Sequence, residues 1–98
     1  MTKDKWKDLI NYLGKEYSLK TIDYVTCGYR RINNNFDIEI QSDWSKGYTH
    51  LRVYVWDITK GLNDESQALE RLEFRNVQEM KDALPIIIEK YSKKGLIK

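Results

Sequence analysis

The fold is decided by one stretch, residues 35–58, which reads NFDIEIQSDWSKGYTHLRVYVWDI. Apolar and polar residues alternate over residues 36–41 and again over residues 50–56. Because successive side chains of a β-strand point to opposite faces, each part predicts a half-buried strand. The segment between them carries Gly47 and predicts the turn of an antiparallel hairpin.

The length of that turn sets the predicted register. A four-residue loop over residues 44–47 pairs Ile38 with Val53 and places Glu39 opposite Arg52. A slip of one residue would place Glu39 opposite an apolar side chain. The hairpin is therefore expected to have one apolar face and one face of acids, bases and aromatic rings.

Helical spacing marks both ends of the chain. Apolar residues over 3–17 recur every three or four positions and predict an amphipathic helix. Asn76 reads as the N-cap of a second helix, whose apolar stripe continues to about Ser92. Pro85 lies inside this helix, so we expect a kink there or two abutting helices. Residues 92–98 are expected to form a flexible tail.

Further strands flank the central hairpin. Residues 21–32 are rich in β-branched and aromatic side chains and predict one strand, joined to the hairpin by a two-residue turn at Asn33 and Asn34. Residues 67–75 predict a fourth strand, with a helical start near Glu65 as the alternative. The expected fold is α+β: a two-layer sandwich with an N-terminal helix, an antiparallel sheet of three or four strands and a C-terminal helix, both helices lying on one sheet face.

The opposite sheet face, which we call the outer face, is the predicted binding site. Trp56, Tyr54 and Arg52 would anchor a partner there, because aromatic rings and guanidinium groups give much contact area for little ordering entropy. Two other interpretations are a solvated face with cross-strand ion pairs and a face covered by a second copy of the chain. The predicted partner-binding residues are Trp56, Tyr54, Arg52, His50, Glu39, Asp37, Arg30, Tyr24 and Arg75.

Composition narrows the class of protein. The 98 residues include 17 bases and 15 acids, and a net charge of +2 is too small for a strong sequence-blind nucleic-acid binder. A single cysteine permits no intrachain disulfide, and no apolar run or signal peptide indicates a membrane or an export route. We therefore expect one cytoplasmic domain over residues 1–98, as a monomer or a homodimer.

No catalytic residue, metal site or cofactor is predicted. Asp37, Asp57 and Lys60 resemble parts of a magnesium-dependent nuclease site, but the alternation places the two carboxylates on opposite faces. His50 has no nucleophile at a recognisable spacing. Cys27 is in phase with the apolar face, together with Tyr29, and is expected to be a core residue rather than a reactive thiol. The chain is therefore expected not to be an enzyme.

The expected function is binding. We expect a small protein that docks a macromolecular partner, a protein, through the outer face and the loop over residues 59–66. The alternative is a single-stranded RNA- or DNA-binding module that stacks bases on the same aromatic rings. Against it, Asp37 and Glu39 would repel phosphate. Small domains of this lysine- and isoleucine-rich composition are often phage or mobile-element inhibitors or regulators, which is the setting we expect.

Overall fold

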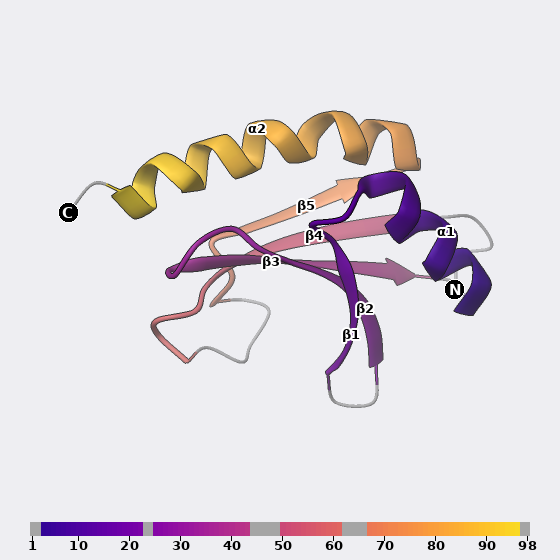
Figure 1. Ribbon diagram of the computed structural model, residues 1–98, viewed down its shortest axis with the longest axis horizontal. Coiled ribbons are helices and arrows are strands. Elements are labelled where there is room, and N and C mark those ends of the chain that lie inside the picture. Colours follow the sequence, from indigo (N-terminus) through magenta and orange to yellow (C-terminus); the bar gives the residue numbers. More distant parts are fainter. Residues whose placement is uncertain (1–2, 23–24, 44–49, 62–66, 97–98) are drawn as a thin grey trace.

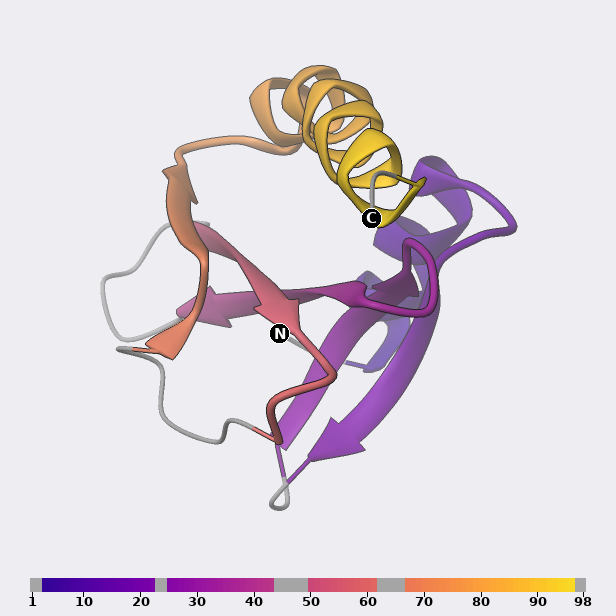
Figure 2. The same ribbon diagram turned by 90° about the vertical axis from the view of Figure 1, so that its left-hand side faces the viewer.

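The computed structural model describes residues 3–22, 25–43, 50–61 and 67–96. An antiparallel five-stranded sheet forms one layer, and both helices lie on one of its faces (Figures 1 and 2). The α+β class is thus confirmed, but the sheet has five strands instead of three or four. In chain order the elements are α1 (Lys3–Leu13), β1 (Ser18–Ile22), β2 (Val25–Arg31), β3 (Phe36–Asp43), β4 (His50–Asp57), β5 (Glu70–Phe74) and α2 (Val77–Leu96).

The additional strand follows α1 directly. Gly14 has a φ of 122°, a left-handed conformation that glycine adopts readily, and it ends the helix earlier than the predicted residue 17. The chain then enters β1, which pairs antiparallel with β2, Ser18 lying opposite Tyr29. Residues 21–32, which were predicted as a single strand, therefore contribute to the hairpin of β1 and β2. This hairpin runs at a steep angle to β3, β4 and β5 (Figure 1).

The central hairpin keeps its predicted faces but not its predicted partners. Ile40 pairs with Val53, and Glu39 pairs with Tyr54 instead of Arg52. The reason is loop length: β3 ends at residue 43 and β4 begins at residue 50, so the connection over 44–49 is longer than predicted, and it lies outside the described residues. A register shift of two residues leaves every side chain on its original face.

The turn between β2 and β3 is also longer than predicted, with three residues instead of two. The N–H of Ile32 donates to the carbonyl of Phe36 at 2.9 Å and closes the turn. Inside it, Oδ1 of Asn33 accepts the N–H groups of Asn35 at 2.8 Å and Phe36 at 3.1 Å. Nδ2 of Asn33 donates to the carbonyl of Tyr91 on α2 at 3.1 Å. The Asn33 side chain thus satisfies two backbone donors of the turn and links the turn to α2.

This extra turn residue exchanges the two faces of β2, because a shift of one residue reverses every side chain. Arg30 pairs with Ile38 and faces the helices, so its predicted place on the outer face is wrong. Cys27 and Tyr29 were predicted on the helix face and lie on the outer face instead. Tyr29 pairs there with Glu39.

The core fills the space between the helices and the sheet. Gly28 lies on the helix face, where a Cβ atom would stand 3.2 Å from Cβ of Ile40 and 3.5 Å from Cδ1 of Ile10 on α1. The absence of a side chain therefore lets α1 approach the sheet closely. The apolar stripes predicted for both helices are confirmed. The buried core residues are Trp6, Leu9, Tyr17, Ile38, Ile40, Leu51, Val53, Val55, Met80, Leu84, Ile87 and Tyr91.

Helix α2 begins as predicted and ends later. Oδ1 of Asn76 accepts the N–H of Glu79 at 2.9 Å, which satisfies a donor of the first turn. The helix is continuous from Val77 to Leu96, beyond the predicted end at Ser92. Pro85 lies within it, so the prediction of two abutting helices is wrong. A kink at Pro85 stays a prediction.

The Asn33 turn generates a stability prediction. Asn33→Ala removes three hydrogen bonds, two of which satisfy backbone N–H groups of the turn. We expect a loss of about 1–3 kcal/mol in the free energy of unfolding, measured by urea denaturation. Asn34→Ala is the matched control, since Asn34 is exposed, and it should change stability by less than about 0.5 kcal/mol. Equal losses in the two variants would contradict the role given to the Asn33 side chain.

Candidate functional site

The outer face of the sheet carries polar and aromatic side chains in rows that cross the strands. Residues paired across neighbouring strands point to the same face, so the register defines these rows. The first row contains Arg31, Asp37 and Trp56; the second contains Tyr29, Glu39, Tyr54 and Arg71; the third contains Gln41, Arg52 and Glu73. Lys20 and Cys27 form one further pair on this face.

Glu39 is the centre of the hydrogen-bond network. Nε1 of Trp56 donates to its Oε2 at 3.1 Å, and Nε2 of Gln41 donates to its Oε1 at 3.0 Å. Both carboxylate oxygens are therefore held by donors, and the indole ring lies across its own sheet. Glu39 and Trp56 are each half-buried. This arrangement fixes the orientation of the indole.

Tyr54 lies beneath this layer and is not available as a contact residue. Its exposed fraction is 0%, although it lies on the face turned away from the helices. Its ring stacks with that of Trp56, with centroids 6.2 Å apart and planes 30° apart. The guanidinium carbon of Arg71 lies 5.9 Å from the centroid of the Tyr54 ring. The Tyr54 ring thus supports the side chains of Trp56 and Arg71 from below.

Asp37 is a partly desolvated carboxylate on the same face. Burial raises its pKa, and this outweighs a hydrogen bond with Tyr29 and the nearby charge of Lys20, which both lower it. Nζ of Lys20 lies 4.4 Å from the centroid of the Tyr29 ring, so the three side chains form one cluster. The cluster gives the outer face a carboxylate whose charged form is disfavoured.

The predicted site is only partly assembled. Trp56, Tyr54, Arg52, Glu39 and Asp37 do lie together on the outer face.

Of the four remaining predicted residues, the structure describes the side chains of two. Arg30 faces the helices, and Arg75 is exposed beyond the end of β5. Tyr24 lies outside the described residues, as does the side chain of His50, the first residue of β4.

Three outer-face residues were missed in the sequence. Lys20 lies in β1, which was not predicted as a strand. The shorter turn assigned Tyr29 to the wrong face, and Arg31 was not assigned to either face. The available signal was the asparagine triplet itself, because asparagine side chains can bond turn backbone and extend a turn.

The thiol and carboxylate groups that were considered as reactive or metal-binding candidates can now be placed. Cys27 is buried, and burial with the nearby Glu39 raises the pKa of its thiol to about 12, which keeps it protonated at neutral pH. Asp57 accepts the N–H of Thr59 at 3.0 Å, away from Asp37 on the other face. Within the described ranges, no three histidine, cysteine or acidic side chains gather in a way that could hold a metal ion.

The chain was compared with protein families, curated proteins and solved structures. No protein-family model, curated protein or solved structure matches this chain. In the part of the chain that the structure describes, no helix is long and apolar enough to cross a membrane.

The raised pKa of Asp37 generates a prediction with a definite sign. Its contribution to stability is full below the pKa of an unfolded aspartate, about 3.9, and is lost as the pH rises through the higher folded-state pKa. The wild type should therefore lose stability relative to Asp37→Asn as the pH rises from 3.5 to 7, measured by urea unfolding of both proteins. Asn keeps an acceptor for the Tyr29 hydroxyl group.

Asp57→Asn is the control of opposite sign. Hydrogen bonds from Thr59 lower the pKa of Asp57, so its contribution is present above the unfolded pKa and lost as the pH falls. The wild type should gain stability relative to this variant over the same rise in pH. The same slope for both variants would contradict the pKa shift assigned to Asp37.

Proposed function

We propose that this chain is a non-enzymatic binding protein whose outer face docks a protein partner. One observation supports the proposal most directly: Trp56 and Arg71 are held in place on a sheet face that neither helix covers. Figure 2 shows both helices on the opposite side of the sheet. Tryptophan and arginine are the residue types most enriched in binding hot spots.

The energetic reason is pre-organisation. The Trp56 indole is fixed by its hydrogen bond to Glu39 and by stacking on Tyr54. Arg71 keeps 50% of its side chain exposed while its guanidinium group lies over the Tyr54 ring. Side chains that are already ordered lose less conformational entropy on association, so more of their contact energy appears as affinity.

The charge pattern favours a protein partner over a nucleic acid. Each row of the outer face contains one acid and one base. A partner with charges of the opposite pattern would be held in one orientation against them. A phosphate backbone would instead meet the carboxylates of Asp37, Glu39 and Glu73. Burial of Tyr54 also removes one of the rings on which bases would stack.

The proposed mechanism is occlusion or recruitment of the partner, without chemistry. We place this function in the cytoplasm, in keeping with the single cysteine, which is buried and unpaired by any disulfide. An inhibitor or regulator of phage or mobile-element origin is the setting that the composition favours.

Charge reversal on the outer face tests the proposal. The wild-type protein is immobilised and a protein partner is captured from the native host. The affinities of the wild type and of each variant for that partner are then measured by calorimetry. We expect Arg71→Glu, and separately Trp56→Ala, to weaken binding at least about tenfold, or about 1.4 kcal/mol.

Lys15→Glu is the matched control, because it makes the same change in charge at an exposed residue between α1 and β1. It should bind like the wild type. All variants are compared by thermal melting, so that loss of binding is separated from loss of fold. Undiminished binding by both folded outer-face variants would refute the proposal.

The nucleic-acid alternative is tested separately by gel shifts with single-stranded RNA and DNA. Phosphate contacts would give affinity that falls steeply between about 50 and 200 mM salt. We expect no shift at the lower salt concentration. A salt-dependent shift lost in Arg71→Glu would favour the nucleic-acid module instead.

A further inference from the structure

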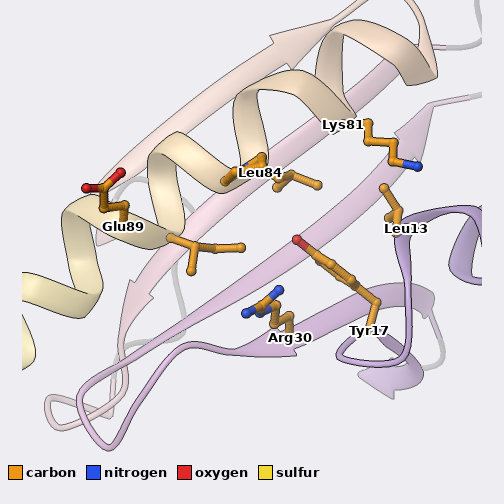
Figure 3. A pocket seen from close by; sticks show the side chains of 8 residues that line it. Leu13, Tyr17, Arg30, Lys81, Leu84 and Glu89 are labelled. Carbon is orange, nitrogen blue, oxygen red and sulfur yellow. The ribbon is translucent and has the colours of Figure 1, made fainter.

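A cleft lies on the other side of the sheet, between the end of α1, the start of β1 and the middle of α2 (Figure 3). Its volume is about 310 Å³, which is at the lower end of the range for small-molecule sites. The surface that lines it is mainly apolar. The lining residues are Leu13, Tyr17, Arg30, Lys81, Leu84, Pro85, Ile88 and Glu89.

Arg30 is the charged group on the sheet side of this cleft. Figure 3 shows its guanidinium group beside Tyr17, beneath Leu84 of α2. The guanidinium carbon lies 5.2 Å from the centroid of the Tyr17 ring. Nε of Arg30 is buried and has no hydrogen-bond partner. Over the described ranges, no carboxylate forms an ion pair with Arg30.

The other two charges of the cleft are engaged elsewhere. Nζ of Lys81 donates to the carbonyl of Tyr12 at 2.9 Å and lies 3.8 Å from the centroid of that tyrosine ring. Glu89 pairs with Lys93 at 3.0 Å, between Oε1 and Nζ. In Figure 3 both charged ends point away from the guanidinium group of Arg30. The interior of the cleft therefore has one cation and one tyrosine hydroxyl group.

A half-buried cation without a counter-ion is unfavourable to the folded state. The residue paired with Arg30 on the neighbouring strand is Ile38, so an aliphatic side chain at position 30 would pack well against it. Residues that break a local rule of stability are concentrated at functional sites. Apolar walls with one fixed cation are suited to an anion that carries a hydrocarbon body.

We propose that this cleft binds a small monocarboxylate with an apolar body. The carboxylate accepts hydrogen bonds from Arg30 and from the Tyr17 hydroxyl group, and the hydrocarbon part packs against Leu84, Pro85 and Ile88. A monoanion matches the single positive charge, and the volume corresponds to about ten water-sized groups. The cleft and the outer face lie on opposite sides of the sheet, so this proposal does not rest on the proposed function.

Octanoate is the probe, and octanamide is its uncharged match in size. Each is titrated into the full-length ¹⁵N-labelled protein below its aggregation concentration, and the Nε–Hε resonance of Arg30 is followed by NMR. We expect octanoate to produce a saturable shift of this resonance, with an affinity at least about tenfold higher than that of octanamide. The comparison needs no variant, so it does not depend on whether a substitution folds.

Variants then assign the binding to the cleft, with backbone amide resonances of α2 as the readout. Arg30→Gln should weaken octanoate binding at least about tenfold. Arg31→Gln is the matched control, because Arg31 is the adjacent arginine, is exposed and lies on the outer face; it should bind octanoate like the wild type. The absence of a saturable shift at 10 mM octanoate, an equal response to octanamide, or equal binding by a folded Arg30→Gln protein would overturn the proposal.

Discussion

The hydrogen bonds of the Asn33 side chain determine how the sheet is put together. Its carbonyl oxygen accepts two backbone N–H groups within the β2–β3 turn, and its amide nitrogen donates to Tyr91 on α2. The first two bonds favour a turn of three residues, and the third fixes that turn against a helix 58 positions later in the chain. One polar side chain thereby couples local turn geometry to the packing of the two layers.

The length of this turn decides which side chains lie on the outer face and which line the cleft. With three turn residues, Arg30 points into the cleft, while Tyr29 and Arg31 lie on the outer face. A two-residue turn would reverse all three side chains. It would also turn Gly28 outward and place a side chain against α1. The composition of the outer face and that of the cleft are therefore two consequences of one register.

The sequence predicted the faces of the strands correctly where apolar and polar residues alternate regularly. It did not predict them where a single side-chain contact sets the register. Alternation over β3 and β4 predicted which side chains face the helices, because a shift of two residues does not change a face. The faces of β2 could not be predicted in the same way, since they depend on the side-chain bonds of Asn33. The burial of Tyr54 was also not predictable, because the alternation gives a direction but not the depth of the neighbouring side chains.

The order of the strands in the sheet is the order in which they occur in the chain, β1-β2-β3-β4-β5. Every strand therefore finds its partner in the adjacent segment, and no pairing has to wait for a distant part of the polypeptide. Short closing loops lose little entropy, and such local topology is associated with rapid two-state folding. We expect hairpins to form early in folding, and the docking of α2, which brings Tyr91 to the Asn33 amide, to complete the native state.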